Sequence, residues 1–217
     1  MIKILGIGSS PRKAATEYSL KQGLKAAKSV PKIETEMIVL RNKNLPHCIH
    51  CDRCIKENSR FCVYHDNYDK EMYEKFYKAD GYLIASPVYT MNINAQLTSF
   101  FNLLRPTWNV MQKNPAYFWD KVGAAISVGG TRHGGQETTI NSIHGFFHTH
   151  GIHVIGGAET YNGGTVWSKD NLKDGAKADK EGMSTVRAIG QRLGIAAFQL
   201  NHDKETNKKL LEELELY

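Results

Sequence analysis

The chain has 217 residues, and 28 Lys and Arg residues against 22 Asp and Glu residues leave a formal charge of +6 at pH 7. A hydrophobic content of 41% with 23% charged residues is that of a folded chain and excludes extended disorder. No apolar run approaches the roughly 20 residues of a membrane-spanning helix, so we expect no membrane partner. The basic residues are scattered among acids, so we also expect no nucleic-acid partner. The apolar N-terminus is too short for a signal peptide, which makes the cytoplasm the expected location.

Hydrophobic periodicity predicts strands and helices in alternation. Five short apolar runs predict strands at residues 2–7, 36–40, 82–86, 122–128 and 152–155. Helices are expected at residues 16–29, 66–81, 94–104, 136–150, 183–198 and 203–217. Because strands that alternate with helices form right-handed crossovers, the pattern predicts an α/β fold with a doubly wound, five-stranded parallel sheet.

The chain shows no repeat and no convincing linker, so we expect one domain at residues 1–200, followed by a C-terminal helix at 201–217. Residues 156–175 are rich in Gly, Asn and Asp and are predicted to form a long functional or interface loop. A cysteine loop, residues 47–65, interrupts the pattern after the second strand.

Ligands of an open parallel sheet bind beyond the carboxyl ends of its strands. In this chain, the loops with unusual composition are expected at that edge. The first of these loops offers the hydroxyls of Ser10 and Thr16, the guanidinium of Arg12 and the N–H groups of a helix start. Such donors favour a phosphate monoester. Pro11 replaces the third glycine of a dinucleotide fingerprint, and a plain strand-to-helix turn remains the alternative.

The loops after the third and fourth strands suit a planar heterocycle. Pro87 makes the first of them rigid, Tyr89 supplies an aromatic face and Asn92 supplies an amide. The second loop contains Gly129, Gly130, Gly134 and Gly135. Glycine lets backbone N–H groups approach a flat ring closely, although simple turn chemistry would also explain these glycines.

All four cysteines of the chain lie in one run, at Cys48, Cys51, Cys54 and Cys62. A Cys-x2-Cys-x2-Cys spacing places three thiolates around a cubane, so the run favours a [4Fe–4S] cluster with Cys62 as the fourth ligand. Zinc is the alternative, although four-cysteine zinc sites usually come as two separated Cys-x2-Cys pairs. The flanking His47, His50 and His65 are expected at the surface or beside the ligands.

A second group of potential metal ligands lies late in the chain. His144 and His148 are four residues apart on a predicted helix, with His150 and His153 just beyond. This spacing could hold a metal, but no carboxylate joins the group, so helix-end packing and solvent contact are the favoured interpretation.

The segments GSSPRK, CIHCDRCIKENSRFC, ADGYLIASPVY and KVGAAISVGGTRHGGQETTINSIH together resemble the archaeal-type iron–sulfur flavoproteins. These form a branch of the NADPH-dependent FMN reductase-like proteins with the flavodoxin fold. The resemblance extends from the first strand to about Trp167. It implies FMN and a [4Fe–4S] cluster in each subunit, a homodimer or dimer of dimers, and ferredoxin as electron donor.

By the same resemblance, the FMN phosphate binds at Ser10, Arg12 and Thr16. The ring is assigned to two loops containing Pro87, Val88, Tyr89, Asn92, Gly129, Gly130, Gly134 and Gly135. Two neighbouring positions depart from the family, because Thr16 and Glu17 replace an Asn-Thr pair. A carboxylate there would repel the phosphate unless it turns away.

The expected function is therefore electron transfer from ferredoxin through the cluster to FMN and on to a two-electron acceptor, with dioxygen or peroxide suggested by the resemblance. The positive charge would attract an acidic ferredoxin. The pattern shows no acid–base catalytic residues. Two alternatives remain: an NAD(P)H-dependent FMN or quinone reductase with a structural or zinc-bound cysteine loop, and a non-enzymatic redox or metal-sensing regulator.

Overall fold

A computed structural model describes residues 1–65, 67–170 and 172–213. Its strands are β1 (Ile2–Gly8), β2 (Ile33–Val39), β3 (Gly81–Pro87), β4 (Val122–Gly129), β5 (His153–Val154) and β6 (Gly164–Trp167). They are ordered β2-β1-β3-β4-β5, and β6 also pairs with β4. Every pair is parallel. This order is that of a flavodoxin-like doubly wound sheet and confirms the predicted fold class.

Two short strands share the position beside β4. The strand β5 pairs with the start of β4 at Val122 and Gly123, and β6 pairs with its end, from Ile126 to Gly129. The prediction that residues 156–175 form one long loop is therefore wrong, because β6 and the first residues of a helix lie within it. The strand β6 has only four residues and lies among glycines, so the sequence pattern is that of a loop. Its pairing with β4 is what makes it a strand.

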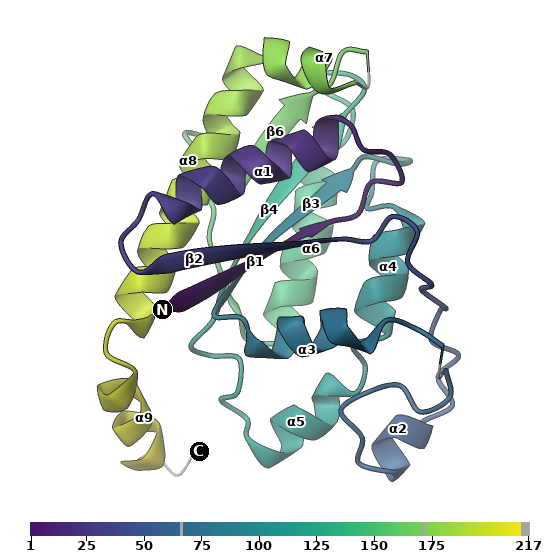
Figure 1. Cartoon of the computed structure of the whole chain (residues 1–217), viewed down its shortest axis with the longest axis vertical. Coiled ribbons are helices and arrows are strands. Elements are labelled where there is room, and N and C mark those ends of the chain that lie inside the picture. The colour runs from purple at the N-terminus through teal and green to yellow at the C-terminus, as the bar shows by residue number, and fades with distance from the viewer. Residues whose placement is uncertain (66, 171, 214–217) are drawn as a thin grey trace.

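The buried strands supply side chains to two cores in alternation. Leu5, Tyr82 and Ile84 face one core, while Ile4 and Leu83 face the other. The first core is covered by α3 (Lys70–Lys78), α4 (Ala95–Asn102) and α6 (Gln136–Thr149). The second is covered by α1 (Ala15–Lys28), α7 (Lys173–Ala178) and α8 (Lys180–Asn201), as Figure 1 shows. Period-two burial on both faces is what a covered parallel sheet requires.

The helices α1 and α8 pack closely because glycines meet at their crossing. A Cβ atom at Gly190 would stand 2.2 Å from the carbonyl oxygen of Gly23. Any side chain at this point would push the two helices apart, so the close contact of α1 and α8 depends on Gly190.

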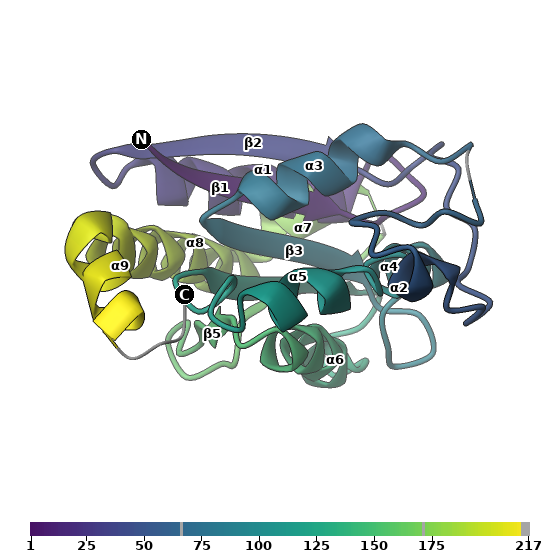
Figure 2. The ribbon, with the colours of Figure 1, turned by 90° about the horizontal axis from the view of Figure 1, so that it is seen from below.

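Three further helices complete the described fold: α2 (Arg53–Lys56), α5 (Thr107–Lys113) and α9 (Lys204–Glu213). The sequence did not predict α2 or α5. The C-terminal helix is confirmed as α9, whereas residues 214–217 lie outside the described part. Figures 1 and 2 both place α9 and α2 on opposite sides of the molecule.

Several predicted boundaries are corrected. The second strand begins at Ile33 rather than at residue 36. Its first residues alternate between apolar and polar, so no apolar run marks them, although they pair with β1. The predicted helix start at Asp66 lies outside the described residues, and α3 begins at Lys70. Across the described ranges, no helix is both long and apolar enough to cross a membrane.

Candidate functional site

The loop between β1 and α1 provides hydrogen-bond donors for an anion. Ser9 is buried and its N–H donates to the carbonyl of Ala85 at 3.0 Å, which fixes the loop on β3. The next residue, Ser10, accepts a hydrogen bond from the N–H of Arg12 at 3.2 Å. Because Ala14 stands at the N-cap position and has no polar side chain, the first N–H groups of α1 are open to a ligand.

Of the predicted phosphate ligands, Ser10 and Arg12 lie on this loop and Thr16 lies in the first turn of α1. Ser10 and Thr16 are buried, whereas the side chain of Arg12 is exposed. A phosphate monoester suits these donors and the positive end of the 14-residue helix α1. The residues present fit the group.

Glu17 turns toward basic partners, so its charge is not left free to repel a phosphate. Its carboxylate lies 2.7 Å from Lys21 and 3.0 Å from Arg41. Burial raises the pKa of Glu17, but the hydrogen bonds and charges of Lys21 and Arg41 outweigh it and hold that pKa below its ordinary value. The negative charge of Glu17 is thus largely compensated beside the phosphate loop.

The loop after β3 is a tight turn. The backbones of Tyr89 and Asn92 exchange hydrogen bonds of 2.9 and 3.0 Å, and the two residues between them, Thr90 and Met91, have φ of 50° and 58°. Two successive left-handed residues are typical of a type I′ turn, where glycine and asparagine are usual. A threonine there is strained, and strain of this kind gathers at ligand sites. Within this loop Pro87 is buried and Tyr89 is exposed.

The loops after β3 and β4 dock on each other. Gly135 has φ of 100°, and a Cβ atom on it would stand 2.7 Å from the Cα of Met91. The hydroxyl of Thr138 donates to the carbonyl of Met91 at 2.7 Å. The side chain of Asn92 accepts from the hydroxyl of Ser142, also at 2.7 Å. The two predicted ring-binding loops therefore form one surface.

Two buried amides that the sequence analysis did not single out hold these loops. Asn94 caps α4 by accepting from the N–H of Leu97 and donates to the carbonyl of Ser9 at 2.7 Å. Gln136 donates to the carbonyl of Thr131 at 2.5 Å and accepts from the N–H of Gly134 at 2.9 Å. The position of Asn94 just before an apolar run was an available N-cap signal, whereas its contact with Ser9 depends on the fold.

The cysteine loop brings its four thiols around one small cavity. Cys48, Cys51, Cys54 and Cys62 all line it, together with Arg105. Cys54 is buried, Cys51 is exposed and the other two are half-buried. The amide of Asn109, on α5, donates to the carbonyls of Cys54 at 2.9 Å and Ser59 at 2.8 Å and so holds the loop against the protein.

Backbone N–H groups point at two of the sulfur atoms. The N–H of His50 donates to Cys48 Sγ at 3.4 Å and the N–H of His65 donates to Cys62 Sγ at 3.5 Å. Hydrogen bonds to sulfur tune iron–sulfur centres. Burial raises the pKa of the Cys54 thiol, and the neighbouring Cys62 adds to the rise. A bound metal cation would offset this rise, because it stabilises the thiolate. Four converging thiols with N–H donors fit a cluster.

An ion pair between Arg105 and Asp52 flanks the cavity, with Arg105 Nε 3.1 Å from the carboxylate. The hydrogen bond from Arg105 holds the pKa of Asp52 below its ordinary value. Asp52 itself has φ of 56°, a left-handed conformation at the start of α2. Arg105 thus fixes the turn between Cys51 and Cys54 and adds positive charge beside the thiols.

Two of the late histidines, His144 and His150, are packed inside the protein. His150 is buried, with Nε2 3.0 Å from the hydroxyl of Thr107 and Nδ1 2.9 Å from the carbonyl of Phe146. His144 is also buried, and burial lowers its pKa to about 4. In the described residues, no three His, Cys, Asp or Glu side chains, those of the cysteine loop included, are gathered closely enough to hold a single metal ion. The four thiols line one cavity, which suits a cluster that four thiolates surround rather than one ion that they share.

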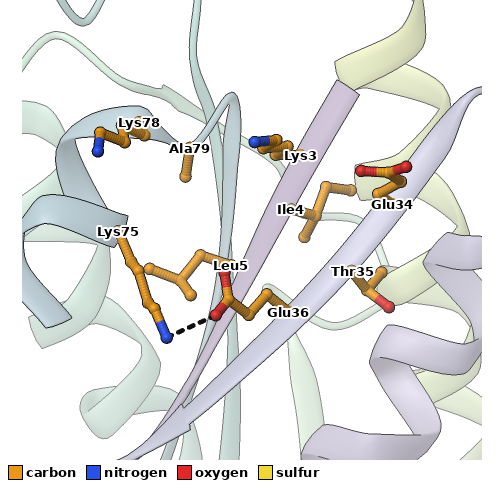
Figure 3. A pocket seen from close by; sticks show the side chains of 9 residues that line it. All are labelled: Lys3, Ile4, Leu5, Glu34, Thr35, Glu36, Lys75, Lys78 and Ala79. Atoms are coloured by element: carbon orange, nitrogen blue, oxygen red, sulfur yellow. Dashed lines mark ion pairs between the residues drawn. The ribbon is translucent and has the colours of Figure 1, made fainter. Parts of the chain in front are cut away.

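Two further hollows lie on the protein. A groove of about 490 Å³ next to the cysteine loop is lined by residues that include Cys48, Phe101, Arg105, Trp108, Phe146 and His150. Figure 3 shows a second hollow, of about 230 Å³, between Lys3 on β1, Glu36 on β2 and Lys75 on α3. Lys75 and Glu36 point at each other there, with an ion pair of 2.6 Å. This hollow is removed from the carboxyl ends of the strands.

Comparison with known proteins agrees with the fold and the loops. Residues 2–164 match the NADPH-dependent FMN reductase family. The chain is 40% identical over 209 residues to an iron–sulfur flavoprotein of Methanosarcina thermophila, a match that covers 94% of this chain and 100% of that protein. It is 36% identical over 194 residues to an iron–sulfur flavoprotein of Methanocaldococcus jannaschii, covering 88% of this chain and 95% of that one.

Among solved structures, RosB with bound 8-demethyl-8-formylriboflavin-5′-phosphate has a TM-score of 0.69 at 14% identity, over 98% of this chain and 87% of that chain. At this identity the likeness supports the fold alone. The chain belongs to the NADPH-dependent FMN reductase family and is a flavin-dependent oxidoreductase. Within that family it belongs with the archaeal-type iron–sulfur flavoproteins, as its motifs predicted.

Proposed function

We propose that this oxidoreductase takes single electrons from a ferredoxin through a [4Fe–4S] cluster, passes them to FMN and reduces a two-electron acceptor such as dioxygen or peroxide. The observation that carries the proposal is the convergence of all four cysteines on one cavity in a chain whose strand-end loops fit a flavin phosphate and ring. When bound, the cluster exchanges one electron and the flavin two, so that together they link one-electron supply to two-electron reduction.

The residues of the chain bind and adjust the two cofactors. Cys48, Cys51, Cys54 and Cys62 would ligate the cluster, with the N–H groups of residues 50 and 65 directed at two sulfurs. Ser10, Arg12, Thr16 and the start of α1 would bind the FMN phosphate. The joined loops, which contain Pro87, Val88, Tyr89, Asn92, Gly129, Gly130, Gly134 and Gly135, would receive the ring. A cytoplasmic location suits the cysteines, because thiols remain reduced there.

An acidic ferredoxin is the partner that the charge favours. The chain carries an excess of six positive charges. Arg53, Lys56 and Arg60 are exposed on the cysteine loop itself. Electrostatic attraction between opposite charges speeds encounter and weakens with salt. The rate of reduction by ferredoxin should therefore fall as salt is raised, and a rate that is independent of salt would remove the steering role.

We also propose a homodimer or a dimer of dimers. Large apolar side chains are exposed near the cysteine loop, among them Ile49, Tyr64 and Trp108. Exposed apolar groups beside a groove favour protein–protein contact. Sedimentation of the purified protein at several concentrations tests the assembly, and a monomer throughout would contradict it.

The decisive experiment is anaerobic purification followed by measurement of iron, sulfide, zinc and FMN. About four iron atoms and four sulfides per chain are expected from a cubane. Cys62→Ala should lose most of the iron and sulfide and keep FMN. The matched control Tyr64→Phe removes one oxygen atom from another lining residue and should keep the cluster.

Other results would select the alternatives. Zinc without sulfide, together with turnover by NAD(P)H, would indicate a reductase with a zinc-bound loop. A cluster that cycles between redox states without turnover of any acceptor would indicate a sensor. Reduction of FMN by ferredoxin that depends on Cys62 supports the proposed electron path.

A further inference from the structure

A buried carboxylate lies behind the predicted ring-binding loops. Asp179 stands at the start of α8, beyond residues 2–164 that match the family. Its side chain is only 1% exposed. A buried carboxylate is stable only with partners that compensate its charge, so its contacts identify what it holds in place.

Both oxygens of Asp179 are engaged by other segments. One oxygen lies 2.5 Å from a guanidinium nitrogen of Arg132, and the other accepts from the backbone N–H of Trp167 at 2.7 Å. An aspartate at an N-cap usually accepts from the N–H groups of its own helix. Here both oxygens are directed instead to the loop after β4 and to the end of β6.

The fit around this carboxylate leaves little space. A Cβ atom at Gly182 would stand 2.2 Å from the second oxygen of Asp179. The backbone of α8 thus confines the carboxylate to the position in which it meets Arg132 and Trp167. A side chain held in this way can fix the geometry of its partners.

Arg132 transmits this constraint to the glycine-rich loop, because it lies between Gly130 and Gly134 in the sequence. Its guanidinium carbon is 5.5 Å from the ring centroid of Trp167. The indole N–H of Trp167 donates to the carbonyl of Gly130 at 3.0 Å. The loop is therefore joined to the end of β6 by two side chains, and Asp179 contacts both residues.

We propose that Asp179 is a positioning residue for the flavin. Through Arg132 and Trp167, it holds the Gly129–Gly135 loop in the conformation that receives the ring. The inference rests on the proposed function, since it requires that this loop bind FMN. Asp179 itself need not touch the cofactor, and its effect should appear in FMN affinity and in the environment of the bound flavin.

The test uses the full chain freed of FMN and then titrated with FMN. Asp179→Asn and Arg132→Gln are compared with the double variant. Asp174→Asn is the matched control, because it makes the same change in an exposed ion pair with Lys177 on the neighbouring helix α7. Flavin fluorescence gives the dissociation constant, visible circular dichroism at saturating FMN reports the ring environment, and thermal unfolding without FMN reports stability.

We expect each single variant to raise the FMN dissociation constant about tenfold or more, a change of about 1.4 kcal/mol. The double variant should bind within about threefold of the weaker single variant, because coupled residues are not additive. Both single variants should alter the visible circular dichroism of bound FMN. The control Asp174→Asn should bind FMN within about twofold of wild type.

Failure of the inference is distinct from failure of the proposed function. If wild type binds FMN and Arg132→Gln binds it equally well with unchanged circular dichroism, the loop does not depend on this pair and the proposal is overturned. Arg132 is partly exposed, so its variant decides the matter even if Asp179→Asn does not fold. Wild type that binds no FMN would instead refute the proposed function.

Discussion

Gly135 joins the two predicted ring-binding loops, and replacing it with alanine is the sharpest test of their geometry. Its φ of 100° lies in a region that costs residues with a Cβ about 1–2 kcal/mol. The new Cβ would also stand 2.7 Å from Met91 Cα and 2.9 Å from Met91 Cβ. Forced contacts of this kind cost about 1–3 kcal/mol. Alanine restricts the unfolded chain and recovers about 0.4–1 kcal/mol.

The net effect of Gly135→Ala is a loss of about 1–5 kcal/mol in the free energy of unfolding. For a chain of this size, that lowers Tm by roughly 2–20 °C. FMN affinity should fall as well, because the loops that bear Met91 and Gly135 separate. Thermal unfolding of the FMN-free protein and FMN titration measure the two effects.

Gly145 supplies the matched control on the same stretch of chain. It lies within helix α6, and a Cβ atom there would meet nothing within 4 Å. Gly145→Ala should therefore stabilise the protein by about 0.5–1 kcal/mol, the helix propensity gained. If Gly135→Ala unfolded at the wild-type temperature and bound FMN as tightly as wild type, the contact between the two loops would not contribute to stability, and the prediction would be wrong.

Two further substitutions test buried groups. The pKa of His144 in the folded protein, about 4, lies below its unfolded value of 6.5, so its contribution to stability is present above that unfolded value and is lost as pH falls toward 4. Urea unfolding should show wild type losing about 3 kcal/mol more than His144→Leu between about pH 7.5 and pH 4, and parallel profiles would contradict this pKa. Asn94→Ala removes the hydrogen bond to Ser9 and the cap of α4. It should lower the free energy of unfolding, measured in urea, by about 1–3 kcal/mol and should weaken FMN binding. An unchanged urea midpoint would show that the amide is dispensable.

The parts of the fold that sequence reasoning predicted are those with a local signal. Apolar runs that end at glycine or proline, such as the run that stops at Pro87, located the three buried strands β1, β3 and β4. Their alternation with helices then led to a parallel, doubly wound sheet and to the edge that carries the predicted site. The close spacing of the cysteines likewise predicted one joint site, and all four line one cavity.

The parts that were missed depend on contacts between distant residues. The strand β6 has four residues, and only its pairing with β4 distinguishes it from a loop. Asn94 meets Ser9 across 85 positions of the chain, and Asp179 meets Arg132 across 47. No periodicity encodes such pairs. A buried amide or carboxylate is recognised as a support for the site only when the fold shows what it touches.

The helix α4 relates the two candidate cofactor sites. Asn94 caps its first turn and binds the predicted phosphate loop through Ser9, while Arg105, three residues after its end, holds the cysteine loop through Asp52. An eight-residue helix is about 12 Å long, which sets the scale of the separation between these two supports. The inner side of α4 is fixed by Leu97 and Phe100, both fully buried. Since a packed helix does not bend easily, each site is held by a polar side chain that lies just before or just after the same rigid element, and a change in one support should leave the other in place.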